Sequence, residues 1–247
     1  MLTDRDLAAL VAGFRDQGLI TSYLGQLRPG KEAQIHCCRR PDGGYAILKY
    51  YTPVALRSFR ADAIYGVGTS FVQTRQLRAI RNTSAFGLRV KLELWTANES
   101  RNAERLREIG IRIPEPLGRL GPALLMRMIG GPDRPAPQLR EAGIDSSAAN
   151  MLLPLLQADI LRMLNHNLVH GDLSPYNILL HRGVHWLIDV PQMVDVAVCP
   201  DARDLFMRDC RSLLGFLHRC GASVDPDLWA RESWERWGNG RLDVRGS

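Results

Sequence analysis

The sequence has little lysine, no CxxC pair and no apolar run long enough to cross a membrane. Five cysteines without that spacing argue against a zinc ribbon and a disulfide framework, and they favour a reducing compartment. Charged residues break the longest apolar stretches before the roughly 20 residues that a membrane span requires. The first residues also lack the basic-then-apolar order of a signal peptide. A cytoplasmic protein without a membrane segment is therefore expected.

Apolar residues make up 45% of the 247 residues, so a well-buried core is expected and wholesale disorder is excluded. That length suits one large domain or two small lobes that share a cleft. The net charge of +6 is compatible with RNA or an anionic small molecule as a partner but requires neither. Only three of the 32 basic residues are lysines, so a lysine kept in such a chain is worth attention.

The first half of the chain predicts strands accompanied by two amphipathic helices. Hydrophobic spacing and turn residues place helices over 3–18 and 95–109, and strands over 22–38, 44–51 and 121–129. Residues 113–116 are expected to be extended because prolines forbid a helix there. Residues 66–90 are rich in Gly, Ser, Thr and Arg, and they predict a mobile loop with some helix.

The second half of the chain predicts mostly helices. A long helix over 145–165, capped by Asp145 or Ser146, precedes short strands over 178–180 and 186–190. Three prolines and two glycines make 130–137 the best linker in the sequence. The predicted division is an N-lobe over 1–130, a hinge over 131–137 and a C-lobe over 138–247. Strands first and helices later indicate a two-lobed α+β protein.

Residues 170–177, His-Gly-Asp-Leu-Ser-Pro-Tyr-Asn, carry the strongest chemical signal. They contain the D-L-x-x-x-N spacing of a kinase catalytic loop. Phosphoryl transfer needs a carboxylate near the incoming hydroxyl and a cation on the phosphates, and Mg²⁺ prefers amide and carboxylate oxygens. Asp172 is therefore the candidate base, with Asn177 and Asp189 as candidate metal ligands. The plain alternative is that Asp172 and Asn177 only cap turns.

Two further elements could hold nucleotide phosphates. Lys49 ends an apolar strand, where an ammonium group can bind phosphates, and Glu99 on the following helix is its natural partner. The alternative is a lysine whose stem packs along the strand edge. Gly30, in the turn between the first strand segments, lets the backbone approach phosphate closely. The G-x₄-G-K spacing of 25–31 is not a Walker A loop, because Glu32 replaces the magnesium-binding hydroxyl.

Remaining candidates are weaker when taken singly. Met126 and Met128 could line an adenine slot, but core packing explains two methionines equally well. His166 and His170 have no third metal ligand near them in the sequence. The C-terminal tryptophans predict a helix that packs on the body of the protein.

Taken in order, these pieces resemble the RIO family of atypical serine/threonine protein kinases, in its RIO1-like branch. The resemblance runs from about residue 18 to residue 217, and its order and spacing make it specific. The most typical piece is Ile-Asp-Val-Pro-Gln at 188–192, which replaces the Asp-Phe-Gly of ordinary protein kinases. The other matching segments are 30–33, 46–51, 95–102, 113–116, 125–126, 135–137, 168–177 and 208–210.

The resemblance implies a kinase-like fold with a small β-rich N-lobe and a reduced helical C-lobe that lacks an activation loop. ATP and Mg²⁺, with Mn²⁺ as an alternative, would bind in the cleft. By position, Lys49 and Glu99 form the ion pair, and Asp172 is the base. Asn177 and Asp189 bind metal, and Asp189 can also take up phosphate as in a slow ATPase. The implied nucleotide-binding residues are Arg28, Gly30, Lys31, Lys49, Met126, Arg127 and Ile129.

The sequence departs from the family in one place and leaves other functions open. Arg28-Pro29 stands where the family usually has Ser-Thr, so the contacts of this turn with the nucleotide phosphates are expected to differ. A small-molecule phosphotransferase of the aminoglycoside or choline kinase kind uses a similar loop, but the 58 residues after Asp189 leave little room for its acceptor lobe. A nucleotide-gated module that docks on RNA or a ribosomal particle is the third possibility. The protein substrate is unknown, and a monomer or weak dimer is expected.

Overall fold

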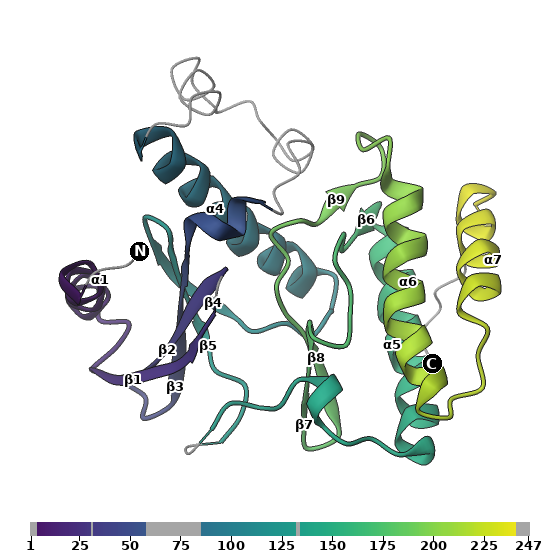
Figure 1. Cartoon of the computed structure of the whole chain (residues 1–247), viewed down its shortest axis with the longest axis horizontal. Coiled ribbons are helices and arrows are strands. Elements are labelled where there is room, and N and C mark those ends of the chain that lie inside the picture. The colour runs from purple at the N-terminus through teal and green to yellow at the C-terminus, as the bar shows by residue number, and fades with distance from the viewer. Residues whose placement is uncertain (1–3, 31, 58–84, 132–133, 241–247) are drawn as a thin grey trace. The chain divides into compact units, whose positions relative to one another are not determined.

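The computed structural model of the chain describes residues 4–30, 32–57, 85–131 and 134–240 (Figure 1). It divides into two units, residues 1–104 with 114–135 and residues 105–113 with 136–247. The predicted N-lobe of 1–130 therefore differs from the first unit at 105–113. These residues group with the second unit because its elements bind them: Arg162 donates to the Gly110 carbonyl, and the Leu187 N–H donates to the Arg112 carbonyl.

The first unit is built on a five-stranded antiparallel sheet with strand order β1-β2-β3-β5-β4. The strands are β1 (Ser22–Pro29), β2 (Ala33–Arg39), β3 (Tyr45–Tyr51), β4 (Pro116–Leu120) and β5 (Ala123–Arg127). Strands β1 to β3 follow the predicted antiparallel pattern. Strand β4 was not predicted, since its short Pro-Leu-Gly-Arg-Leu sequence has no clear alternation, and pairing with β5 decides its structure.

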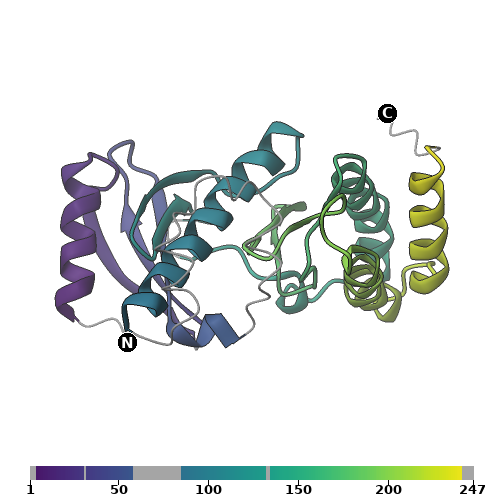
Figure 2. The same ribbon diagram turned by 90° about the horizontal axis from the view of Figure 1, so that it is seen from above.

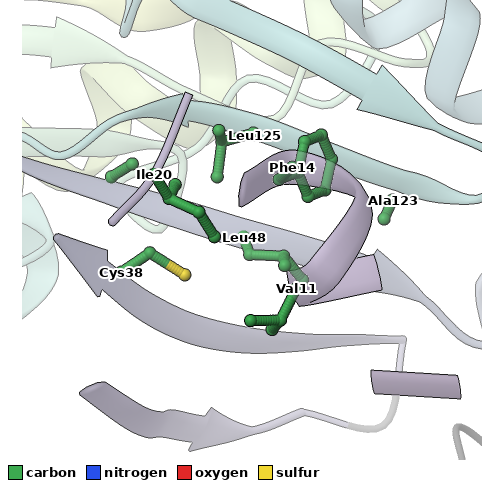
Figure 3. Close-up of a cluster of buried hydrophobic side chains, with 8 residues drawn as sticks. Val11, Phe14, Ile20, Cys38, Leu48, Ala123 and Leu125 are labelled. Atoms are coloured by element: carbon green, nitrogen blue, oxygen red, sulfur yellow. The ribbon is translucent and has the colours of Figure 1, made fainter. Parts of the chain in front are cut away.

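Helix α1 (Asp4–Asp16) covers one face of this sheet and confirms the predicted N-terminal helix. The helix ends before Gly18, which has a positive φ of 69°. Between α1 and the sheet lies a buried hydrophobic core, where each enclosed Leu, Ile or Phe contributes about 2 kcal/mol (Figure 3). Its members are Val11, Phe14, Ile20, Cys38, Ala46, Leu48, Ala123 and Leu125.

Helix α4 (Ala85–Glu108) lies on the opposite side of the sheet from α1 (Figure 2). Leu92 and Trp95 of this helix pack on Tyr51 of β3 and on Ala55 of the short 3-10 helix η1 (Pro53–Arg57). The two faces of β3 therefore have different partners: even-numbered residues meet α1, and odd-numbered Tyr51 meets α4.

The start of α4 corrects a prediction from the sequence. The helix begins at Ala85 rather than at residue 95, so the helix expected within the predicted loop over 66–90 occupies 85–90 and continues into the one predicted from residue 95. The part of that loop over 66–84 lies outside the described residues. Gly87 and the charged residues around it hide the apolar spacing, whereas the burial of Val90 and Leu92 in the folded unit favours a helix.

Three helices dominate the second unit: α5 (Ser146–Asn165), α6 (Ala202–Arg219) and α7 (Pro226–Gly238). Asp145 is the N-cap of α5, as predicted, and its carboxylate accepts the Ala148 N–H at 2.8 Å. Helix α7 packs on α6 through the rings of Trp234 and Phe206, whose centroids lie 5.4 Å apart. The predicted packing of the C-terminal tryptophan helix is thereby confirmed for Trp234.

Two short strand pairs and the 3-10 helix η3 (Leu139–Glu141) complete the second unit. The pairs are β6 (Leu168–Val169) with β9 (Val194–Asp195), and β7 (Ile178–His181) with β8 (Val184–Leu187). Neither β6 nor its partner β9 was predicted. Residues 188–190 were predicted as strand but are not, because Asp189 adopts a left-handed conformation that no strand accommodates.

Among the described helices, none has the length and apolar character to span a membrane.

Candidate active site

In the first unit, Lys49 and Glu99 form a buried ion pair, as their sequence positions predict. Lys49 Nζ lies 2.7 Å from Glu99 Oε1, and the two side chains are 10% and 2% exposed. Strand β3 supplies the lysine and helix α4 the glutamate, so the ion pair joins the sheet to the helix. At these positions an isolated charge would be costly, and the pairing and hydrogen bonds are what make its burial tolerable.

Next to Lys49, the same face of the sheet carries apolar side chains. In the antiparallel register Lys49 lies opposite Ile35, and Ile47 lies opposite both Cys37 and Met126. Side chains alternate between faces along a strand, so these residues share the Lys49 face. Met126 is half-buried there, consistent with either of its two predicted roles.

Two backbone N–H groups at and just after the end of β5 are already bonded within the first unit. The Arg127 N–H donates to the Glu115 carbonyl, and the Met128 N–H donates to the Tyr45 carbonyl. The Arg127 guanidinium also binds the Glu115 carboxylate at 2.9 Å. The amide of Arg127 is therefore occupied within the first unit.

The turn between β1 and β2 contains the predicted phosphate loop. A Cβ at Gly30 would lie 2.3 Å from the Ala33 carbonyl oxygen, so only glycine fits this turn. Arg28 is exposed at the end of β1, opposite Ile35. Lys31 lies outside the described residues.

In the second unit, the loop after β6 brings Asp172 and Asn177 together. The Asn177 side-chain amide donates to the Asp172 carbonyl at 2.8 Å and to its Oδ2 at 3.3 Å. Asp172 is exposed, whereas Leu173 and Asn177 are buried. Because its nitrogen is bound to Asp172, the Asn177 amide presents its oxygen, a hard ligand, for coordination.

Two neighbouring residues of helix α6 bind the backbone of this loop. Asp209, which is buried, accepts the Gly171 N–H at 2.8 Å and the Leu173 N–H at 3.0 Å, one on each carboxylate oxygen. Its neighbour Arg208 donates to the Gly171 carbonyl. The backbone on both sides of Asp172 is therefore fixed by one turn of helix, which limits the positions open to the Asp172 carboxylate.

The position of Gly171 explains why arginine, usual there in protein kinases, is absent. Gly171 has a φ of 80°, and a Cβ would lie 2.6 Å from the Gln192 carbonyl oxygen. Gln192 ends the Ile-Asp-Val-Pro-Gln segment. The loop of Asp172 and the segment 188–192 thus touch backbone to backbone at a point that admits no side chain.

Asp189 follows β8 in a strained backbone conformation, with a φ of 64°. The Ile188 N–H donates to the Asn177 carbonyl at 2.9 Å, which joins the loop of Asp189 to that of Asn177. Buried His170 adds a second link, with its Nε2 3.3 Å from the Ile188 carbonyl oxygen. Burial lowers the pKa of His170 to about 4, so its imidazole is neutral at pH 7 and donates from Nε2.

No group of three His, Cys, Asp or Glu side chains that could bind a metal occurs in the described part of the chain. A cation held jointly with nucleotide phosphates needs fewer protein ligands. Asn177 and Asp189 supply two hard oxygen donors on loops that are bonded together, so the donor set fits Mg²⁺.

The pKa of Asp209 allows a test of the loop anchor. Burial raises the pKa of this carboxyl from 3.8 to about 7, against the opposing effect of its N–H donors and Arg208. The folded protein therefore takes up this proton below pH 7 and the unfolded chain only near pH 4, so this group adds stability as pH falls between them. We expect the free-energy deficit of Asp209→Asn to grow by a few kcal/mol at most from about pH 7.5 to 5.

Urea unfolding of wild type and Asp209→Asn at the two pH values measures this difference. His170 acts with the opposite sign, losing stability as pH falls from 6.5 toward 4, but it is present in both proteins and cancels. Asp201→Asn is the matched control, since this exposed aspartate precedes α6 and its side chain makes no cap hydrogen bond. An equal deficit at both pH values would contradict the expected titration of Asp209.

Comparison with protein-family models matches residues 38–228 to the RIO1 model, which describes a RIO domain. The chain belongs to the RIO domain family. The matched segment contains both members of the ion pair and the catalytic and metal-binding candidates of the second unit. The turn at Gly30 lies before it.

Three relatives align with this chain at 29% identity. Serine/threonine-protein kinase RIO1 of Caenorhabditis elegans aligns over 209 residues, 84% of this chain and 39% of the worm protein. RIO-type serine/threonine-protein kinase Rio1 of Haloferax volcanii aligns over 224 residues, 91% and 72% of the two chains. Serine/threonine-protein kinase RIO1 of Homo sapiens aligns over 221 residues, 89% and 37%. The chain thus spans about two fifths of the worm and human relatives.

Two solved structures of the Rio2 kinase from Chaetomium thermophilum have similar folds. One, an ADP/Mg²⁺-phosphoaspartate complex, gives a TM-score of 0.72 at 21% identity and covers 99% of this chain and 68% of that one. The other gives 0.69 at 22% identity and covers 94% and 68%. These similarities confirm the predicted α+β kinase-like fold, with a β-sheet in the first unit and helices in the second.

Sequence reasoning missed the residues that position the site. Asp209 lay in a recognised segment, but its role needed the contacts with Gly171 and Leu173. Tyr51 was not singled out, although it lies two residues after Lys49 and hence on the same face of β3. The spacing of two residues along the strand could have identified Tyr51 from the sequence. Nothing in the sequence near Gly171 predicts its backbone contact with Gln192.

Proposed function

We propose that this protein is an ATP- and Mg²⁺-dependent serine/threonine protein kinase of RIO type. It transfers the γ-phosphoryl group of ATP to protein hydroxyls, including its own. The observation that carries the proposal is the buried 2.7 Å ion pair of Lys49 and Glu99 in a RIO domain that also holds the anchored loop of Asp172 and Asn177. The relatives named as serine/threonine-protein kinases support it.

The first unit is proposed to bind the nucleotide. The apolar sheet face around Ile35, Ile47 and Met126 suits adenine, and the Arg127 carbonyl and Ile129 N–H supply hydrogen bonds to its edge. Lys49, fixed by Glu99, places its charge on the α- and β-phosphates.

The turn of the first unit is proposed to meet the phosphates. Its backbone at Gly30, with Arg28 and Lys31, would approach them. Pro29 supplies no N–H at this point, so charge from the neighbouring basic residues takes the place of a backbone donor.

The second unit is proposed to activate the acceptor and hold the cation. The exposed Asp172 carboxylate accepts the proton of the incoming hydroxyl. The Asn177 amide oxygen and the Asp189 carboxylate would hold Mg²⁺, which neutralises charge on the phosphates when bound.

Asp189 is also the proposed acceptor in a side reaction. Its carboxylate oxygen forms a bond to the γ-phosphorus while the bond to the β,γ-bridging oxygen breaks and ADP leaves. Water then cleaves the acyl phosphate and returns Asp189 and inorganic phosphate, which amounts to a slow ATPase. A solved Rio2 relative is described as an ADP/Mg²⁺-phosphoaspartate complex, and this supports the assignment.

The test is incubation with γ-labelled ATP and Mg²⁺, following labelled protein and free phosphate together. Asp189→Asn is expected to lower both by about 10² or more, because a carboxylate ligand is lost while asparagine tolerates the left-handed backbone. Acid-stable label indicates Ser or Thr, and hydroxylamine-labile label indicates Asp189. Asp201→Asn should behave as wild type. If wild type at saturating ATP yields no more label or phosphate than Asp189→Asn, the proposal is wrong.

A cytoplasmic location is part of the proposal. All five cysteines are free and four of them are buried, as suits a reducing compartment. The proposed substrate is a protein, and RNA or a ribosomal particle is proposed as a further partner. The proposed oligomeric state is a monomer or a weak dimer.

A further inference from the structure

Tyr51 binds the second oxygen of the Glu99 carboxylate. Its hydroxyl donates to Glu99 Oε2 at 2.6 Å, while Lys49 Nζ donates to Oε1 at 2.7 Å. Each carboxylate oxygen therefore has its own donor from β3. Two donors on separate oxygens fix the orientation of a carboxylate, which a single ion pair leaves free to rotate.

The ring of Tyr51 makes two further contacts. Lys49 Nζ lies 4.6 Å from the ring centroid, within range of a cation–π interaction. The ring of Trp95 meets it edge-on, with centroids 6.2 Å apart and an interplanar angle of 86°. Trp95 precedes Glu99 by one helical turn, so both contact Tyr51 from the same side of α4. Tyr51 is only 3% exposed, which strengthens these interactions.

We infer that Tyr51 is a positioning residue for the phosphate-binding lysine. When Lys49 turns part of its hydrogen bonding toward a phosphate, the Tyr51 hydroxyl keeps Glu99 in place. The Lys49 ammonium group can then bind a phosphate while it keeps its hydrogen bond to the Glu99 carboxylate. This inference rests on the proposed nucleotide site and adds to it a residue that acts through Glu99.

The test is Tyr51→Phe, which keeps the ring, its packing on Trp95 and its contact with Lys49, and removes only the hydroxyl. The affinities for ATP, ADP and adenosine are measured by calorimetry in the presence of Mg²⁺. We expect ATP and ADP to bind about tenfold more weakly, because a hydrogen bond to a charged group is lost. Adenosine has no phosphates for Lys49 to hold, so its affinity should stay within about twofold of wild type.

Tyr50→Phe is the matched control. Tyr50 is the adjacent tyrosine of the same strand, but it packs against the core beneath α1 on the other face. The same chemical change there should leave all three affinities as in wild type. If Tyr51→Phe binds ATP as wild type does, or loses adenosine as strongly as ATP, the positioning role is wrong.

A double variant separates action through Glu99 from a general loss of structure. In a Glu99→Gln background the charged acceptor is already gone, so adding Tyr51→Phe should weaken ADP binding by less than about twofold. A further tenfold loss would show that Tyr51 acts by another route. Failure of wild type to bind ATP or ADP at all would instead overturn the proposed function, so the two failures are distinguishable.

Discussion

Asp172→Asn is expected to lower phosphoryl transfer by about 10³ while ADP·Mg²⁺ affinity stays within threefold of wild type. General-base catalysis typically contributes between about 10² and 10⁴. Asparagine has the shape of aspartate but cannot accept the proton of a hydroxyl. The loop should survive the change, because its backbone is held by Asp209 and Arg208 rather than by the Asp172 carboxylate.

Single-turnover transfer from γ-labelled ATP, together with calorimetry of ADP binding, checks this expectation. Asp201→Asn makes the same chemical change at an exposed aspartate of the second unit and should leave both quantities unchanged. Transfer by Asp172→Asn within tenfold of wild type would remove Asp172 from the role of base. A matching loss of ADP affinity would assign it to nucleotide binding instead.

The fold was predictable where local patterns agree with tertiary packing. Alternation and turn residues predict β2 and β3, and the cap at Asp145 marks the start of α5. The errors fall where packing overrides local preference. The first turns of α4 look irregular in sequence although Gly87, Val90 and Leu92 are buried there, and β4 exists through its pairing with β5.

The candidate site was predictable in its motif residues but not in the residues that hold them in place. Motif spacing identifies Lys49, Asp172 and Asn177, since the chemistry requires those residue types in that order. The supports depend on contacts between distant segments. Asp209 contacts the loop across 36 and 38 residues of sequence, and Tyr51 contacts Glu99 from another element 48 residues away. Such contacts have no fixed spacing, and only the folded structure reveals them.

Lys49→Met is expected to reduce the free energy of unfolding by about 3 kcal/mol or more and to abolish measurable phosphoryl transfer. Removal of one partner leaves the other as an uncompensated buried charge, and Glu99 is only 2% exposed. Methionine keeps most of the volume of the lysine stem, so the loss comes from the charge rather than from a cavity. Urea unfolding followed by circular dichroism measures the stability.

The double variant Lys49→Met with Glu99→Gln separates stability from function. Glutamine carries no charge and its side-chain oxygen can still accept the Tyr51 hydroxyl, so stability should return to within about 1 kcal/mol of wild type. Transfer should stay absent, because no ammonium group is left for the phosphates. Lys91→Met makes the same change at a lysine of α4 that is not part of the ion pair, and it serves as the control. It should alter neither the stability nor the phosphoryl transfer. If the double variant is as unstable as Lys49→Met alone, the unpaired charge of Glu99 is not the cause, and the lost contact of the Lys49 ammonium group with the Tyr51 ring takes its place.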